Sequence, residues 1–419
     1  MRLKKVLILG GASVHVKLAA AAKELGYYTI VTDYLEDSPA KSIADESWLI
    51  NVMDVNTIVE ECKKENVAGV VSGWLDPCQR PYQEICEKLG LPCYGTKEQF
   101  FKMTDKHAFK DMCIKNGVDV IPEYSMKDVE EDRVEYPVFV KPVDSRGSRG
   151  QAICNTRSEL DAAREDAIKE SSSGEIIIEK YIGNTNSFQV TYFFVNGEAF
   201  LIRTADGYKG LVEEKLDKVA LCSISPSVHT ELYMHTTHER IVSMLKNMGF
   251  KNGPAMLQGF NDNGVFRFYD PGLRFPGVEY DLIYKELYGI DVMKEMVRFA
   301  VTGRMEPMNI KNEFSLLSGK AAAVLFPTVS AGTIASITDM SELNDVDKIV
   351  AVSLRHGIGD TVDWTYNVSQ RLGEIDLYDD DLECLIEMIK KIQAELKVTS
   401  VEGHDMMYMP FKTERISRK

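Results

Sequence analysis

Residues 136–150 combine the residue types that bind phosphate groups. They read Y-P-V-F-V-K-P-V-D-S-R-G-S-R-G. The apolar run 138–140 predicts a short buried strand that delivers Lys141 to its end, and Pro142 stops the strand from continuing. The following loop, 145–150, offers backbone N–H groups and the charge of two arginines, which suits phosphate oxygens. Taken alone, such a loop is more often an ordinary solvated hairpin.

A second apolar run ends in charged residues further along the chain. Residues 176–183 read I-I-I-E-K-Y-I-G and predict a buried strand that ends at Glu179 and Lys180. An extended segment of this kind leaves backbone groups for the edge of an adenine base, and Tyr181 with Ile182 would cover the base.

Another lysine stands at the start of a predicted helix. Residues 103–106 read M-T-D-K and open this helix, which carries Lys106. The sequence G-x-x-x-x-G-K-[ST] does not occur in the chain, and Lys141 precedes its glycines rather than following them. These residues therefore indicate a phosphate site that is not a Walker loop.

The order of these landmarks resembles the ATP-grasp superfamily. T-D-K, V-F-V-K-P, the Gly/Ser loop, I-I-I-E-K-Y-I-G and finally D-P-G-L-R at 270–274 follow one another over nearly the whole chain. The pattern is most similar to the carboxylate–amine ligases and the biotin-carboxylase-like branch. The resemblance implies an ADP-forming ligase that activates a small carboxylate as an acylphosphate and joins it to an amine, by default an amino acid or related metabolite.

The resemblance also implies roles for individual residues. Lys106, Lys141 and the loop would bind the phosphates of ATP, Glu179 to Ile182 would hold the adenine, and Asn186 stands where relatives often carry a ribose-binding glutamate. The expected nucleotide-binding residues are Lys106, Lys141, Ser145, Arg146, Gly147, Ser148, Glu179, Lys180, Tyr181, Ile182 and Asn186. The expected catalytic residues are Arg274, Lys141 and Arg149, with Arg274 stabilising the transferred phosphate.

The metal ligands depart from the family pattern. Residues 255–270 predict a hairpin, on which relatives carry a glutamate and then E-x-N-P-R to hold two magnesium ions. Here the corresponding residues are Gln258, Asp270 and Gly272, and a neutral amide or a glycine is a much poorer ligand than a carboxylate. We expect Asp270 to hold Mg²⁺ or Mn²⁺ with Gln258 as a weak second ligand, and Glu279 or Asp281 to compensate. The number of ions and the retention of turnover stay open.

Two alternatives compete with the ligase hypothesis. A nucleotide-binding homologue without turnover, a sensor or scaffold, would explain the thinned metal site. A biotin carboxylase is less favoured because it needs a carrier and the chain contains no M-K-M attachment sequence. In the N-terminal region a dinucleotide site is disfavoured, because the first turn reads G-G-A-S-V-H where G-x-G-x-x-G is required.

Composition limits the partners. The 419 residues are 44% hydrophobic and 27% charged, with a formal charge of −15, which disfavours nucleic acid and anionic membranes. No apolar run approaches the length of a membrane span, so we expect a cytoplasmic protein with small-molecule carboxylate and amine substrates. A homodimer is left open. The eight cysteines show neither C-x-x-C nor Cys/His spacing, so they indicate no zinc site or disulfide framework.

The chain divides into three expected domains of mixed α/β and α+β class. Residues 1–98 alternate strands and helices and predict a doubly wound parallel sheet. Residues 99–306 predict an ATP-grasp core of two α+β lobes, in which the small lobe, about 113–183, closes over the phosphates. Residues 307–419 predict a small C-terminal α+β domain. Within the core, 204–228 is expected to be mostly loop, with Asp206, Lys209 and Lys215 available to substrate, and 231–248 one helix.

Overall fold

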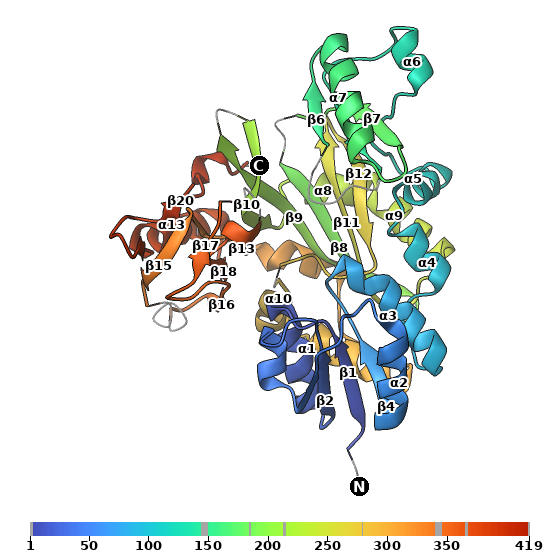
Figure 1. The fold of residues 1–419 in the computed structure, drawn as a ribbon, viewed down its shortest axis with the longest axis vertical. Coiled ribbons are helices and arrows are strands. Elements are labelled where there is room, and N and C mark those ends of the chain that lie inside the picture. The colour runs from blue at the N-terminus through green and yellow to red at the C-terminus, as the bar shows by residue number, and fades with distance from the viewer. Residues whose placement is uncertain are drawn as a thin grey trace.

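The computed structural model describes residues 3–143, 150–183, 186–212, 215–278, 280–339, 346–364 and 368–417. Figure 1 shows the N-terminal region in blue at the bottom, a small lobe in teal and green at the top, and the C-terminal region in orange and red at one side. A large sheet lies at the centre of these three regions.

The N-terminal region is built on a four-stranded parallel sheet in the order β3-β2-β1-β4. Its strands are β1 (Lys5–Leu9), β2 (Tyr28–Thr32), β3 (Glu46–Trp48) and β4 (Val67–Val71). Its helices are α1 (Ser13–Glu24), α2 (Val55–Glu65) and α3 (Asp76–Leu89). The apolar residues of β1 and β4 are buried, as expected for strands covered on both faces. The parallel α/β sheet predicted for this region is confirmed.

The small lobe carries a three-stranded antiparallel sheet in the order β6-β5-β7. The strands are β5 (Val138–Pro142), β6 (Ala152–Cys154) and β7 (Ile176–Lys180). Helix α7 (Arg157–Glu170) packs on this sheet, and α4 (Lys97–Lys102), α5 (Lys106–Lys115) and α6 (Met126–Glu130) precede it in the chain. The strand that ends at Lys141 and the strand that ends at Lys180 therefore lie side by side.

The central sheet has eight strands in the order β12-β11-β8-β9-β10-β13-β18-β16. The bounds are β8 (Ser187–Val195), β9 (Glu198–Val212), β10 (Lys215–Ser225), β11 (Gly253–Asp262), β12 (Val265–Gly272), β13 (Ala321–Leu325), β16 (Ile349–Leu354) and β18 (Gly373–Asp379). Three of these strands follow residue 306, so the sheet crosses the expected boundary between core and C-terminal domain. The domain boundaries stay predictions.

Two sequence predictions for the core are wrong. Residues 204–228 are not mostly loop, because β9 and β10 occupy 198–212 and 215–225 as long paired strands. Their polar residues hid the strand pattern: Asp206 is buried on one face, where it accepts hydrogen bonds from Ser227 Oγ (2.6 Å) and Val228 N (3.0 Å). The helix expected at 231–248 is interrupted at Thr237 into α8 (Thr230–Thr236) and α9 (His238–Asn247).

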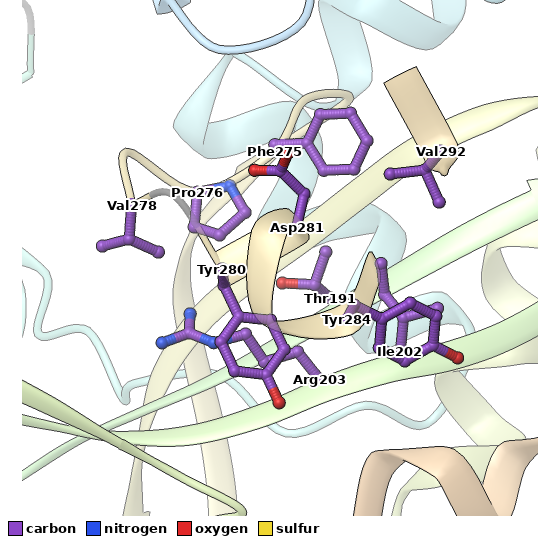
Figure 2. Close-up of a pocket in the computed structure, with 10 residues that line it drawn as sticks. All are labelled: Thr191, Ile202, Arg203, Phe275, Pro276, Val278, Tyr280, Asp281, Tyr284 and Val292. Atoms are coloured by element: carbon purple, nitrogen blue, oxygen red, sulfur yellow. The ribbon is translucent and has the colours of Figure 1, made fainter. Parts of the chain in front are cut away.

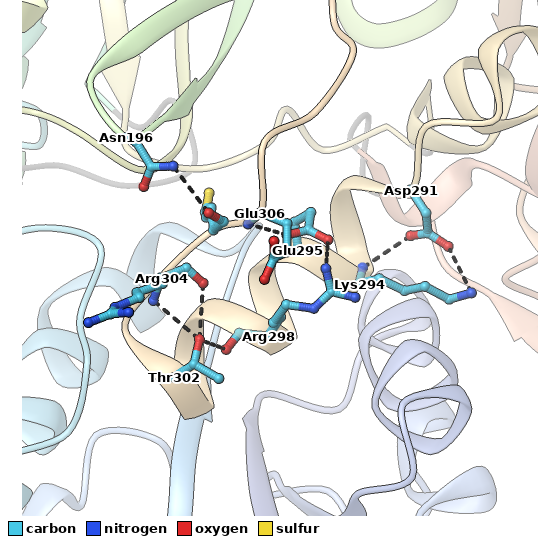
Figure 3. A network of polar contacts seen from close by, with 9 residues as sticks. Asn196, Asp291, Lys294, Glu295, Arg298, Thr302, Arg304 and Glu306 are labelled. Carbon is cyan, nitrogen blue, oxygen red and sulfur yellow. Dashed lines mark hydrogen bonds and ion pairs between the residues drawn. The ribbon is translucent and has the colours of Figure 1, made fainter.

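The helices after β12 tie the central sheet to the N-terminal sheet. These are α10 (Tyr280–Tyr288) and α11 (Val292–Thr302), and α11 packs on β4 so closely that a Cβ at Gly69 would lie 2.6 Å from Ala300 O. Figure 3 shows the polar contacts that fix the end of α11. Glu295 accepts hydrogen bonds from Arg298 Nη1 (2.5 Å) and Glu306 N (3.1 Å).

The C-terminal region adds small sheets and one long helix beside β13, β18 and β16. They are β14 (Thr328–Val329), β15 (Gly332–Ile337), β17 (Thr361–Val362), β19 (Val398–Ser400), β20 (Met407–Tyr408) and α13 (Leu382–Glu395). Short 3₁₀ helices lie at Pro39–Ile43, Asn312–Gly319, Val368–Gln370 and Thr413–Arg415. None of the helices in the described part of the chain is both long and apolar enough to cross a membrane.

Candidate functional site

A cavity of about 510 Å³ lies between the small lobe and the central sheet. It brings together eight residues that the sequence predicted for the site: Lys106, Lys141, Glu179, Lys180, Tyr181, Ile182, Asn186 and Asp270. These residues come from α5, β5, β7, the start of β8 and the end of β12. The cavity is large enough for a nucleotide and has both charged and apolar walls.

Lys141 is held in place by a buried carboxylate on the neighbouring strand. Its Nζ lies 2.6 Å from Glu179 Oε1, and both side chains are buried. Glu179 Oε2 also accepts from Lys110 Nζ at 3.2 Å, and Lys110 in turn pairs with Glu123. The Glu179 side chain, expected on the adenine edge, therefore bridges two lysines. Its contact with the base stays a prediction.

Lys106 and Lys110 stand one turn apart on α5, so both face the small sheet. Asp105 caps the helix by accepting from Ala108 N at 2.9 Å. Lys106 Nζ donates to Val143 O at 3.3 Å, at the entrance to the glycine-rich loop. Burial lowers the pKa of Lys106, and the charge of Lys141 lowers it further. A phosphate placed between the two lysines would relieve this repulsion.

Aromatic and apolar side chains form the walls expected around a base. Phe139, Ile153, Phe260 and Tyr269 line the cavity with Tyr181 and Ile182. The rings of Phe260 and Tyr269 are stacked with centroids 5.1 Å apart. The sequence analysis did not predict that Phe139, Ile153, Phe260 and Tyr269 line the cavity. Phe139 could have been predicted, because it lies two residues before Lys141 and so on the same face of β5.

Lys180 and its backbone are partly committed to other contacts. Its Nζ lies 2.8 Å from Asp262 Oδ2, and its backbone N–H donates to Pro122 O at 2.9 Å. That N–H group is therefore not available to an adenine base. Lys209, in contrast, lines the cavity from β9 in a segment expected to be loop. Burial lowers the pKa of Lys209. The side chain of Lys215 lies outside the described residues.

The expected metal residues face each other across two strands. Asp270 on β12 lies directly opposite Gln258 on β11, and the register shifts immediately after this pair. Burial raises the pKa of Asp270, and the nearby charge of Arg274 opposes that rise. No group of three or more His, Cys, Asp or Glu residues that could hold a metal occurs within the described ranges.

This donor set fits one hard cation better than two. Mg²⁺ is commonly bound by one or two carboxylates together with substrate phosphates and water, which a single Asp270 beside a triphosphate could provide. Asp281, expected to compensate, does not serve this purpose: it pairs with Lys17 of α1, and both side chains are buried. Glu279, the other expected substitute, lies outside the described residues.

Arg274 lies just beyond Asp270 and contacts the N-terminal region. Its Nε and Nη2 donate to the two carboxylate oxygens of Asp76, the first residue of α3, with Nη2 3.0 Å from Oδ2. Its Nη1 donates to Phe275 O at 3.1 Å. The side chain of Arg274 is therefore held by a carboxylate of the N-terminal region.

A second, much smaller cavity lies beyond Arg274. Figure 2 shows Arg203 and Tyr280 among the side chains that line it. Arg203 is buried, its Nη1 lies 2.6 Å from Gln189 Oε1 and its guanidinium stacks on Tyr280 at 4.6 Å from the ring centroid. Burial lowers the pKa of Arg203 to about 10. The cavity holds about 20 Å³, the space of a water molecule, which is too little for a substrate.

Part of the predicted site falls outside the described residues. This part is the loop after Val143, which contains Ser145, Arg146, Gly147, Ser148 and Arg149. The phosphate contacts expected from these residues stay predictions. Gln258 and Arg274 are described but do not line the 510 Å³ cavity; Gln258 lies opposite Asp270, and Arg274 lies beyond Asp270.

Comparison with known proteins supports a nucleotide site in this region. The family model of the carbamoyl-phosphate synthase L chain, ATP binding domain, matches residues 105–193. The small subunit of 2-oxoglutarate carboxylase from Hydrogenobacter thermophilus is 25% identical over 330 residues, which cover 72% of this chain and 67% of that protein. The formate-dependent phosphoribosylglycinamide formyltransferase of Wolinella succinogenes is 26% identical over 185 residues, 42% of this chain; the match spans only 48% of that relative's length.

Solved structures share the whole architecture. Phosphoribosylglycinamide synthetase from Anaerococcus prevotii superposes with a TM-score of 0.76 at 18% identity, over 95% of this chain and 100% of the other. The chain has the ATP-grasp fold. The proteins it is related to are ATP-grasp ligases, and the resemblance noted in the sequence is confirmed.

Proposed function

We propose that this protein is an ADP-forming ligase that activates a small carboxylate as an acylphosphate and joins it to an amine. The observation that carries the proposal is the cavity that joins Lys106, Lys141 and Glu179 on one wall to Asp270 on the other. Cations on one side and a half-buried carboxylate on the other are the arrangement that a metal-bound triphosphate requires. The relatives' names agree: one is a formate-dependent formyltransferase, that is, an enzyme that uses a small carboxylate.

The chemistry proceeds in two displacements. A carboxylate oxygen attacks the γ-phosphorus of ATP in line, the bond to the β-phosphate oxygen breaks, and ADP leaves with that electron pair. The amine nitrogen then attacks the acyl carbon, and the tetrahedral intermediate expels phosphate as the amine loses its proton to solvent.

The described residues place and neutralise charge during these steps. Lys106 and Lys141 bind the phosphates, and Glu179 fixes the position of Lys141. Arg274 stabilises the transferred phosphoryl group with the N–H groups that Asp76 and Phe275 leave unused. Asp270 would hold Mg²⁺ or Mn²⁺, which supplies further neutralisation of the phosphate charge. An amino acid or related metabolite as substrate, a homodimer and a cytoplasmic location are further parts of this proposal.

A screen for ADP release tests the proposal. Pools of small carboxylates and amines are incubated with ATP and magnesium or manganese, and ADP is expected only when both pools are present. Arg274→Ala should keep ATP binding by calorimetry and remove product formation. If Arg274→Ala weakens ATP binding as much as loss of Lys141 does, the role given to Arg274 is wrong.

A non-catalytic nucleotide-binding protein is the second candidate. It is favoured by the lack of a carboxylate at positions 258 and 272 and of any three-residue metal cluster among the described residues. This candidate predicts ATP binding without ADP release for every pool. The retained cations around the cavity favour the ligase, because binding alone does not require an arginine beyond the metal residue.

A further inference from the structure

The contact between Arg274 and Asp76 joins two regions that lie far apart in the sequence. Arg274 follows β12 of the central sheet, and Asp76 opens α3 of the N-terminal region. Arg274 is 8% exposed, while the side chain of Asp76 is 61% exposed. A guanidinium that bonds both oxygens of one carboxylate has a fixed direction as well as a neutralised charge.

The same part of the N-terminal region also fixes the backbone on both sides of Arg274. Leu273 N donates to Gln79 Oε1 (3.1 Å), and Tyr94 Oη donates to Leu273 O (2.9 Å). Gln79 Nε2 holds Asp76 Oδ1 at 2.9 Å. After the arginine, Phe275 N donates to Gly73 O at 2.7 Å. Asp76 is therefore one element of a fixed support and not a loose carboxylate that happens to meet an arginine.

Gly272 makes room for this conformation of Arg274. A Cβ at position 272 would lie 3.0 Å from Arg274 Cγ and 3.2 Å from its Nε, closer than nearly all real contacts of that kind. The family pattern places an asparagine at this position, whereas this chain has a glycine. Gly272 therefore has two effects: it removes one expected metal ligand, and it leaves the space that the aliphatic part of the Arg274 side chain occupies next to Asp76.

Three of the five N–H groups of Arg274 are used in these contacts, two by Asp76 and one by Phe275 O. One N–H on each terminal nitrogen is left. Among the charged groups that shift the pKa of Asp270, Arg274 has the largest effect. The unused N–H groups of Arg274 are therefore on a guanidinium that contacts Asp76 and lies near Asp270, the residue expected to hold the metal.

We propose that Asp76 is a positioning residue for Arg274: it holds Nε and Nη2 so that the remaining N–H groups meet the transferred phosphoryl group. This role rests on the proposed ligase function. A carboxylate is required because an asparagine offers only one oxygen, and so loses one of the two bonds. Gly272 belongs to the same arrangement, since a side chain there would press on the arginine stem.

The first test measures Arg274 directly and needs no substrate. Phenylglyoxal modifies accessible arginines, and mass spectrometry of peptides gives the rate at Arg274 with Arg298 as internal reference. Asp76→Asn should raise the Arg274 rate several-fold, and Gly272→Ala should do the same by displacing the side chain. Asp54→Asn is the matched control: it makes the same change at the N-terminus of α2, where Asp54 accepts from Thr57 N. An unchanged Arg274 rate in Asp76→Asn would overturn the proposal.

The second test separates positioning from a cap that substrate displaces. With the pools that give ADP release, Asp76→Asn should lower kcat by about 10- to 100-fold, as misplacement of a catalytic group does. ATP affinity and melting temperature should not change, and Asp76→Glu should recover part of the rate. An unchanged or higher kcat in Asp76→Asn contradicts positioning.

If wild type releases no ADP with any pool, the ligase function fails, while the labelling result still decides whether Asp76 holds Arg274.

Discussion

The two sides of the cavity differ in how completely they are built. On the small-lobe side, Lys141 and Lys110 share the buried carboxylate of Glu179, and Lys106 stands beside them. On the central-sheet side, Asp270 faces the neutral amide of Gln258, and no described side chain donates a hydrogen bond to the Asp270 carboxylate. On the first side two lysines are already paired with a buried carboxylate, whereas the second side carries a half-buried carboxylate whose charge is left for a ligand.

Under the proposed function, the two sides of the cavity would serve two different steps. Lys106, Lys141 and Lys209 all line the cavity and would bind the phosphates of ATP. Phosphoryl transfer would depend on fewer groups, Asp270 and Arg274, of which Arg274 is held by a different region of the chain. Changes on the two sides should therefore affect different measurements.

The largest effect is expected for Asp270→Asn. The developing phosphoryl charge would lose the group that holds its main counter-ion, so ADP release with productive pools should fall to background, about 1000-fold or more. ATP binding without metal should persist, because the lysines are intact. Calorimetry and an ADP assay on the same samples check both parts. Unchanged turnover would place the metal elsewhere and would invalidate the correspondence of residues 258–274 with the family pattern.

The next effect is expected for Lys141→Met, on the opposite wall. The lost charge-assisted bond is worth about 1.5 to 3 kcal/mol, so ATP should bind roughly 10- to 100-fold more weakly and turnover should be lost at ordinary ATP concentrations. Glu179 would keep Lys110, which limits the damage to the fold. Equal ATP affinity in wild type and Lys141→Met, measured by calorimetry, contradicts a phosphate role for Lys141. Lys64→Met, at an exposed site on α2, is the control.

The sequence predicted the small-lobe side better, because its residues lie within short, regular elements. Lys141 follows an apolar run that predicts a strand, and Lys106 lies where residues 103–106 open a helix, so both positions follow from local patterns. The position of Lys110 could also have been predicted, since it lies four residues after Lys106 on the same helix face. Its pairing with Glu179 was missed because no sequence pattern identifies the partner of a buried carboxylate.

The transfer side depends on contacts between distant segments, which no local pattern reveals. Asp76 and Arg274 meet only after the N-terminal sheet docks against the end of β12. Strand β9 was mistaken for a loop because Gly207 and Lys209 face the cavity while Asp206 is satisfied by hydrogen bonds on the other face. A strand with polar residues on both faces has no apolar alternation to detect.

The half-buried carboxylate of Asp270 should also cost stability at neutral pH. Burial raises its pKa, so the folded state binds the proton more tightly than the unfolded state does. The penalty is absent below the unfolded pKa and is complete once the pH exceeds the folded pKa. In metal-free buffer Asp270→Asn should therefore melt at a higher temperature than wild type at pH 7. The difference should shrink as the pH falls through the raised pKa toward the ordinary range of a carboxyl. A variant that melts lower than wild type at pH 7 would show that Asp270 is paired in the folded protein.

The smallest effect, and the one that separates the two candidate functions, is expected for Gln258→Glu. Gln258 lies directly opposite Asp270, so the substitution places a second carboxylate across the strand pair without changing the size of the side chain. Magnesium should bind several-fold more tightly in the presence of nucleotide, and a ligase should keep or raise its rate of ADP release.

Gln189→Glu is the matched control. Gln189 lies opposite Gln258 on the neighbouring strand β8, but its Oε1 accepts a hydrogen bond from Arg203 and it does not line the cavity. If magnesium tightens only in Gln258→Glu, the end of β12 and its neighbour form the metal site. If wild type and Gln258→Glu both bind nucleotide and neither releases ADP with any pool, the protein is the second candidate, a nucleotide-binding protein that does not hydrolyse or transfer from ATP.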